Sequence, residues 1–241
     1  MKIGIQVLAY NCEATFEKIL KPWLKLKNKY DIQIWVGSGQ FKEYDELGYK
    51  NLNQKTEELL STLFKKGDID FVFHPDLDNL LTDAETRNKC IPWMKDHDID
   101  LMIQVDADEF YSNKEAKNLI EFVEANPDHT IYNTIFKNVI GDGIIEDWSR
   151  FSAGWIKKHG GIKNYYFDMH WSFNDGFDYR SQSVKEIPKN LLNPYHYTWT
   201  NGMNTTGPSH IKQKIDYQNK IYSTGCSFEW DDSNNEIKIK K

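Results

Sequence analysis

The stretch Leu101–Phe110, with the sequence LMIQVDADEF, places a mostly apolar run directly before three carboxylates. A short apolar run bounded by polar residues predicts a buried strand, most typical of a parallel sheet. Open α/β sheets bind their ligands beyond the carboxyl ends of their strands. The three carboxylates are therefore expected at the edge of the sheet where such folds carry their chemistry.

Asp106 and Asp108 are two residues apart, and residues at that spacing point to the same side of an extended backbone. Two converging carboxylates repel each other unless a cation joins them or one of them takes up a proton. A hard divalent cation, such as a Mg²⁺ that also carries substrate phosphates, is one interpretation of this pair. The other interpretation is an acidic loop that caps the following helix.

Strand-like and helix-like segments alternate on both sides of this stretch. Thr82–Glu85 and Ser112–Glu115 are capping boxes and predict helix starts. Pro22 is expected to kink or split its helix, and Pro92 is expected to interrupt another. The alternation predicts βαβ units, a mostly parallel central sheet and helices on both of its faces. The expected strands are Ile3–Leu8, Asp31–Val36, Ile69–Phe73, Leu101–Val105 and Thr130–Phe136.

The pattern changes after about Asn138. The region Ile144–Trp199 is rich in Trp, Tyr, Gly and Asn, and its periodicity is weak. We expect short, partly antiparallel strands there, joined by long loops. Long loops within a compact domain are usually functional or disordered, and the aromatic content favours ordered ones.

The composition indicates a soluble globular protein. Of the 241 residues, 27% are charged and 39% are hydrophobic, and the net charge of -6 argues against nonspecific binding to nucleic acid. The three cysteines have no framework spacing, which is typical of reduced thiols in a cytoplasmic protein. No apolar run approaches the roughly 18 residues of a membrane span, and we expect a cytoplasmic location.

Three further residues could take part in ligand binding or catalysis. Arg87, near the start of a predicted helix, can bind a phosphate, pair with an aspartate near the strand ends or form a surface ion pair. Tyr10, which follows the first strand, can stack on a nucleobase or pack in the core. His196 lies among aromatic residues, where it can complete a metal site or be a hydrogen-bonded core residue.

Taken together, these residues resemble a GT-A glycosyltransferase, most similar to family 2, over roughly residues 3 to 136. The family opens with a strand that leads into Tyr-Asn-x-Glu, which here is Tyr10–Glu13 (YNCE). Its next helix carries Ala-x-x-Arg-Asn, here Ala84–Asn88 (AETRN). An apolar strand then ends in Asp-x-Asp, here Asp106–Asp108 (DAD). His196 matches more loosely a histidine that some GT-A enzymes use as a further metal ligand.

The resemblance implies an α/β GT-A fold, with a central, mostly parallel sheet flanked by helices and a smaller acceptor region of mixed sheet and loops. Residues 1–241 would form a single domain, in which 1–136 bind the nucleotide sugar and 137–241 bind the acceptor. It also implies a transfer, with inversion, of a sugar from a nucleotide-diphosphate donor to an acceptor hydroxyl. A UDP-sugar is the expected donor, and Mn²⁺ or Mg²⁺ is the expected cofactor.

The resemblance also assigns roles to single residues. Asp108 would bind the metal, Asp106 would contact the metal or the ribose, and His196 would be a further metal ligand. Tyr10 would lie against the base, and Arg87 would face the diphosphate or orient the aspartates. The expected donor-binding residues are Tyr10, Asn11, Glu13, Asp83, Arg87, Asn88 and Asp106.

An inverting transferase needs a carboxylate that takes the proton from the acceptor hydroxyl. The candidates lie in the second half of the chain and are Asp168, Asp147 and Glu146. The chain has no clear match to the Glu-Asp motif that usually bears this base. It also departs from the family at Trp35–Ser38 (WVGS), which lacks the aspartate that reads uracil, so the base of the donor stays open.

Two alternatives remain beside this interpretation. A nucleotidyltransferase would share the sheet and the use of a metal ion to bind phosphates. It usually carries a Gly-rich phosphate loop near its first strand, which is absent here. A non-catalytic sugar-binding or scaffold protein would give Asp108 no special role. The acceptor (glycan, lipid, protein or modified nucleic acid) and the oligomeric state are open as well.

Overall fold

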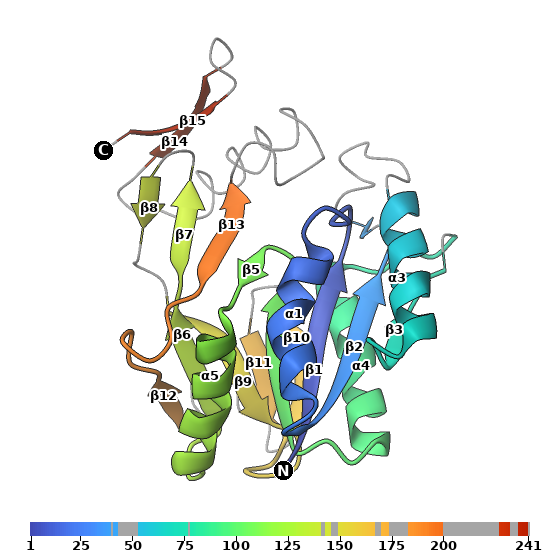
Figure 1. Cartoon of the computed structure of the whole chain (residues 1–241), viewed down its shortest axis with the longest axis vertical. Coiled ribbons are helices and arrows are strands. Elements are labelled where there is room, and N and C mark those ends of the chain that lie inside the picture. The colour runs from blue at the N-terminus through green and yellow to red at the C-terminus, as the bar shows by residue number, and fades with distance from the viewer. Residues whose placement is uncertain are drawn as a thin grey trace.

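The structure is a computed structural model of the whole chain, and its central element is a seven-stranded sheet (Figure 1). The strand order is β12-β6-β9-β4-β1-β2-β3. These strands are β1 (Lys2–Ala9), β2 (Asp31–Ser38), β3 (Phe71–Phe73), β4 (Leu101–Asp106), β6 (Ile131–Ile135), β9 (Ser149–Trp155) and β12 (Val184–Glu186). The structure describes residues 1–39, 41–42, 53–76, 78–140, 143–145, 149–166, 170–173, 183–199, 227–231 and 236–240.

The sheet is mostly parallel, as predicted. Strands β3, β2, β1 and β4 run parallel to one another, and β12 runs parallel to β6. Strand β9 is antiparallel to both β4 and β6, between which it lies. The strands β1 to β4 therefore end at one common edge of the sheet, and the architecture is α/β with a mostly parallel central sheet.

Helices cover both faces of the sheet (Figure 1). Helices α1 (Phe16–Leu26), α3 (Gln54–Lys66) and α5 (Asn113–Ala125) contribute to one buried apolar cluster, and α4 (Asp83–Asp96) contributes to the other. Complete burial of an aliphatic side chain contributes about 1.5–3 kcal/mol, so these two layers stabilise the sheet from both sides. No helix in the described part of the chain has the length and apolarity needed to cross a bilayer.

The helix starts agree with the sequence, but the effect of the prolines does not. Thr82 and Ser112 each form both hydrogen bonds of a capping box at the starts of α4 and α5. Pro22 and Pro92, in contrast, lie within continuous helices, so the predicted split at Pro22 and the interruption at Pro92 are wrong. The buried faces of α1 and α4 compensate for the backbone hydrogen bond that each proline removes.

The acidic stretch does not continue as one extended strand. Strand β4 ends at Asp106, and Ala107 and Asp108 form a turn. The expectation that Asp106 and Asp108 face one side of an extended backbone is therefore wrong. The turn instead returns the chain into β5 (Glu109–Phe110), which pairs with a second sheet.

The second sheet carries the remaining side of the site. Its order is β5-β13-β7-β8, with β13 (Tyr195–Trp199), β7 (Lys137–Ile140) and β8 (Gly143–Ile145). Strand β13 places His196 opposite Glu109 on one side and opposite Asn138 on the other. The antiparallel pair β10 (Ile162–Tyr166) with β11 (His170–Phe173) lies in the region predicted to hold short strands, and β14 (Ser227–Asp231) with β15 (Glu236–Lys240) form a further antiparallel pair.

Candidate active site

Asp106, the last residue of β4, lies between two guanidinium groups. Arg87 Nη2 donates to its Oδ1 over 2.8 Å, and Arg150 Nη2 lies 3.4 Å from its Oδ2. Burial opposes ionisation of this carboxyl group, but the charges of Arg87 and Arg150 outweigh it and lower the pKa of Asp106. Asp106 is therefore a carboxylate held by two cations at the carboxyl edge of the sheet.

Arg87 is fixed by its surroundings. Its side chain is only 4% exposed, and its Nε donates over 2.6 Å to Asp83, one turn earlier on α4. The ring of Tyr165 covers the guanidinium at 5.3 Å. Its Nη1 is buried and has no hydrogen-bond partner among the described residues. A buried N–H donor left in this way fits an anionic ligand.

Arg150 comes from β9 and contacts the other acidic group. Its Nη1 lies 3.3 Å from Glu109 Oε1, and 3.2 Å and 3.1 Å from Nδ1 and Nε2 of His196. The ring of Phe136 lies 5.6 Å from its guanidinium. The side chain remains 19% exposed, which is more than that of Arg87.

Glu109 differs from Asp106 in its protonation. Its side chain is 4% exposed, and its Oε2 accepts a hydrogen bond of 3.0 Å from the backbone N–H of Asp106. Burial, together with the nearby charge of Asp106, raises the pKa of Glu109 to about 8. Near neutral pH this residue is therefore largely a protonated acid that supports the turn.

His196 is held by Asn138 and faces Asp108. Its Nδ1 lies 2.8 Å from Asn138 Oδ1, an acceptor, which assigns the proton to Nδ1. Burial lowers the pKa of His196, so the imidazole is neutral and its Nε2 is an acceptor. This Nε2 lies 3.4 Å from Asp108 Oδ1. Asp108 and His196, predicted as metal ligands, are thus brought together, whereas Asp106 is directed at the arginines.

The donor set fits a divalent cation poorly. Within the part of the chain that the structure describes, no three or more His, Cys, Asp or Glu side chains are arranged so that they could hold a metal ion. Asp108 and His196 offer two ligands, but the guanidinium of Arg150 lies against the same imidazole. The requirement for Mn²⁺ or Mg²⁺ stays a prediction.

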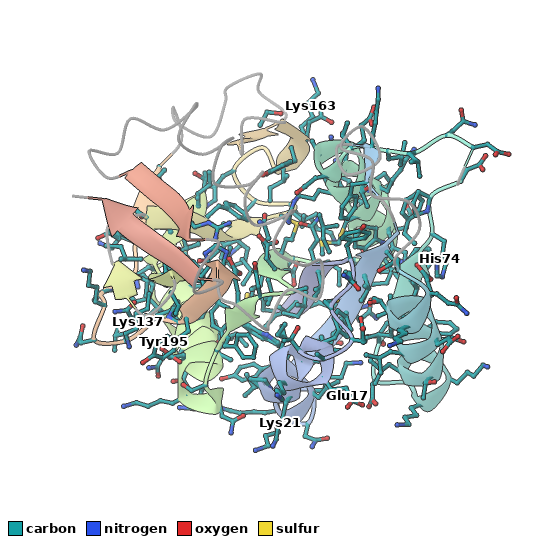
Figure 2. All side chains as sticks on the ribbon, turned by 90° about the horizontal axis from the view of Figure 1, so that it is seen from above. Glu17, Lys21, His74, Lys137, Lys163 and Tyr195 are labelled. Atoms are coloured by element: carbon teal, nitrogen blue, oxygen red, sulfur yellow. The ribbon has the colours of Figure 1, made fainter. Side chains whose placement is uncertain are left out.

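A second polar cluster lies at the ends of β2 and β3. Asn53 Nδ2 donates to Ser38 Oγ over 3.1 Å and to Glu57 Oε1 over 3.0 Å, and Ser38 also donates to Glu57. The other oxygen of Glu57 lies 2.7 Å from Nδ1 of His74. Seen onto this edge of the sheet, His74 lies on the α3 side and Tyr195, the neighbour of His196, on the opposite side (Figure 2).

The Tyr10–Glu13 segment follows β1 and contacts this cluster. Asn11 adopts a φ of 48°, and its backbone N–H donates to Asn53 Oδ1 over 2.7 Å. Glu13 accepts a hydrogen bond from Thr56 over 3.2 Å. The ring of Tyr10 packs at 6.1 Å from that of Phe41. These residues line the carboxyl end of β1, and their contact with a donor stays a prediction.

Asn88 has a clear structural partner. Its amide donates to the backbone carbonyl of Tyr165 over 2.9 Å and accepts from the backbone N–H of the same residue over 2.5 Å. This pair fixes β10 on α4, so that Tyr165 covers Arg87; the predicted contact of Asn88 with the donor is untested. The three candidates for the catalytic base, Asp168, Asp147 and Glu146, lie outside the described residues.

Several residues of the site were not identified from the sequence. Arg150 and Asn138 follow no recognisable motif, because β9 and β7 bring them to the acidic turn through long-range pairing. Glu57 and His74 come from α3 and from the segment after β3. One indication of this cluster was present in the sequence. Ser38 ends the second strand, in the stretch Trp35–Ser38 where the family usually carries the aspartate that reads uracil.

The sequence matches no protein-family model and no curated protein. Some solved structures are similar over part of their length. TarS from S. aureus is 16% identical with a TM-score of 0.42, and the match covers 61% of this chain and 23% of TarS. For a cytidylyltransferase from Leptospira borgpetersenii the identity is 19% and the TM-score 0.36, covering 56% of this chain and 54% of the other.

A third similar structure is a protein from Desulfovibrio desulfuricans that is described as a nucleotide-diphospho-sugar transferase. It is 10% identical with a TM-score of 0.36, and the match covers 93% of this chain and 90% of that protein. The chain therefore spans less than a quarter of TarS and about half of the cytidylyltransferase. Likeness at this level assigns the chain neither to a family nor to an activity.

Proposed function

We propose that the chain is a glycosyltransferase that takes a sugar from a nucleotide-diphosphate donor and transfers it to an acceptor hydroxyl with inversion. The observation that carries the proposal is the position of Asp106 between Arg87 and Arg150, at the edge where β1 to β4 end. α/β sheets bind their ligands at this edge, and guanidinium groups suit phosphate oxygens in geometry and charge.

The buried donor of Arg87 supports a diphosphate at this place. Breaking the bond between sugar and diphosphate leaves negative charge on the nucleoside diphosphate. Fixed positive groups that are already oriented stabilise this charge without reorganising. Arg87 meets that condition, since Asp83, Asp106 and Tyr165 hold it in place and leave its Nη1 without a partner among the described residues. Asp106, oriented by the arginines, would then contact the ribose.

The nucleobase would lie at the opposite end of the same edge, in the cluster of Asn53, Glu57 and His74. This cluster offers an imidazole and a carboxylate at the ends of β2 and β3, which are the polar groups that can read the edge of a base. Uridine is the base that the family resemblance implies. The proposal includes a catalytic base that takes the proton from the acceptor hydroxyl, with Asp168, Asp147 and Glu146 as its candidates. It also includes the cytoplasmic location.

A thermal-shift screen of nucleotide sugars tests the proposal, followed by mass spectrometry of the released nucleotide and of any transfer product. We expect at least one nucleotide sugar to stabilise the protein. In Asp108→Asn, a change beside His196, we expect turnover to be lost. Asp98→Asn is the matched control, because Asp98 is an exposed aspartate far from the edge of the sheet.

Two results would contradict the proposal. No stabilisation by any nucleotide sugar would favour a sugar-binding or scaffold protein without catalysis. Release of pyrophosphate from a nucleoside triphosphate and a sugar 1-phosphate, without sugar transfer, would identify a nucleotidyltransferase instead.

A further inference from the structure

Arg150 lies beside two carboxyl groups and the imidazole of His196. Its guanidinium faces Asp106 Oδ2 at 3.4 Å, Glu109 Oε1 at 3.3 Å and the ring nitrogens of His196 at 3.1–3.2 Å. These contacts come from β4, β5 and β13, so one side chain of β9 joins both sheets of the site. A divalent ion at the same place would use the same kinds of ligands.

The geometry around His196 shows why a positive donor belongs here. Nδ1 donates to Asn138, which leaves the Nε2 lone pair facing Asp108 Oδ1 at 3.4 Å. An imidazole lone pair and a carboxylate oxygen repel each other unless a donor or a cation is close to both. Nη1 of Arg150 lies 3.1 Å from Nε2 and 3.2 Å from Nδ1, so a positive group lies against this imidazole.

The two arginines of the site are held differently. Arg87 makes short contacts of 2.6 Å and 2.8 Å with two aspartates and is 4% exposed. The contacts of Arg150 with the carboxyl groups of Glu109 and Asp106 are 3.3 Å and 3.4 Å, and its side chain is 19% exposed. Charge-assisted bonds of full strength are shorter than these. Arg150 can therefore exchange these longer contacts for shorter ones to a phosphate group, whereas Arg87 is a fixed part of the site.

The charges of the site change sharply when Arg150 is removed. The guanidinium of Arg150 lies 3.4 Å from Asp106 and 3.3 Å from Glu109, and Asp108 lies against the imidazole that Arg150 contacts. Without Arg150 these carboxyl groups would lose a neighbouring positive charge, which a divalent ion could replace.

We propose that Arg150 takes the place of a divalent cation, so that its guanidinium binds the donor diphosphate directly and donor binding does not depend on a metal ion. This inference rests on the proposed function, since it names the group that meets the diphosphate. The planar guanidinium can bind two phosphate oxygens at once, which a lysine ammonium cannot do in the same geometry.

Isothermal titration calorimetry with nucleoside diphosphates tests this inference. Each of ADP, CDP, GDP, TDP and UDP is titrated into the full chain, once with EDTA and once with Mn²⁺. For the diphosphate that binds best, we expect dissociation constants that agree within about threefold in the two conditions. In Arg150→Met we expect binding in EDTA to weaken by about tenfold or more, as for a lost charge-assisted contact, and Mn²⁺ to restore part of it.

Two further variants separate binding from folding. Arg150→Lys keeps the charge without the planar fork and should lie between the wild type and Arg150→Met; if Arg150→Met does not fold, the comparison is made with Arg150→Lys alone. Lys157→Met removes an exposed lysine that pairs with Asp98 away from the site, and it should bind as the wild type does. Thermal unfolding of each variant reports whether the fold is intact.

The outcomes distinguish this inference from the proposed function. Binding by the wild type that EDTA abolishes and Mn²⁺ restores would overturn the role of Arg150 but keep the transferase. Unchanged affinity in folded Arg150→Met, or in Arg150→Lys where only that variant folds, would also overturn it. If no nucleoside diphosphate binds in either condition, the proposed function itself fails.

Discussion

Arg87 Nη2 lies 2.8 Å from Asp106 Oδ1, so a cation at the start of α4 pairs with the last residue of β4. The pair is local to the site but distant in sequence, and it depends on the close packing of α4 against the sheet. Breaking it leaves a carboxylate that is 18% exposed with one guanidinium at 3.4 Å. The stability of the fold and the geometry of the site are therefore linked at this contact.

Replacing Arg87 tests that link. Arg87→Met removes the buried guanidinium and should lower the free energy of unfolding by about 3 kcal/mol, because one partner of a buried pair is left behind. Urea denaturation measures this value. Lys117→Met, which removes one partner of an exposed pair on α5, should change it by less than about 0.5 kcal/mol. Equal effects of the two substitutions would show that the Arg87–Asp106 contact does not stabilise the fold.

Gly37 permits the packing of α4 on which Arg87 depends. A Cβ at this position would lie 2.8 Å from Thr86 Cγ2 and 2.8 Å from the ring of the buried Trp35. Gly37→Ala should therefore destabilise the protein by about 1–3 kcal/mol through overpacking. Gly67→Ala is not a matched control, because Gly67 has a φ of 77° and would be strained. An unchanged melting temperature of Gly37→Ala would mean that α4 can shift freely.

Glu109 should give the protein a distinct dependence of stability on pH. Its pKa in the folded state, about 8, is higher than the ordinary value of 4.5, so the folded state binds the proton more tightly than the unfolded state. The resulting stabilisation is full below pH 4.5 and is lost as the pH rises to about 8. Glu109→Gln cannot titrate, and its free energy of unfolding should fall less between these pH values than that of the wild type.

Urea denaturation of both proteins at a series of pH values gives the free energy of unfolding of each. Subtracting one from the other removes the contribution of Asp106 and of other groups that both proteins share. The pKa of Asp106 is lowered, so its stabilisation is lost only at acidic pH and in the opposite direction. Parallel curves for the wild type and Glu109→Gln would show that Glu109 is ionised throughout.

Asn138 should control the protonation of His196. Its Oδ1 accepts from Nδ1 of a neutral imidazole, whose pKa is lowered by burial. Asn138→Asp places a carboxylate at the same atom, so the pKa of His196 should rise and its charged form should persist to higher pH. ¹H–¹⁵N NMR of the imidazole nitrogens follows this titration. The signals of the exposed His159 serve as the control and should not move between the two proteins; no change at His196 would refute the contact.

Much of the sheet could be predicted from the sequence, because its signals are local. Strand β4 is an apolar run, and Thr82 and Ser112 are capping residues whose partners lie three residues ahead. The effect of the prolines was predicted wrongly because the hydrogen bond that a proline removes is a local feature. The burial that compensates for it comes from distant parts of the chain.

The site could be predicted only in part, for the same reason. Asp106, Asp108 and His196 stand out by type and position, and the structure brings them to one place. Arg150 could not be recognised, since it reaches Asp106 only because β9 enters the sheet antiparallel between β4 and β6. The turn at Asp108 and the pairing of β5 with β13 likewise depend on contacts across the chain.

The central claim is that the carboxyl edge of the sheet binds the diphosphate of a nucleotide. Calorimetric titration of the wild-type chain with the nucleoside diphosphate that binds best, and with the matching nucleoside, tests it most directly. The diphosphate should bind at least about 100-fold more tightly than the nucleoside, with affinity that falls as salt is added, because charge-assisted bonds to Arg87 and Arg150 supply the difference. Equal affinity of diphosphate and nucleoside, or the absence of binding by both, would contradict the claim.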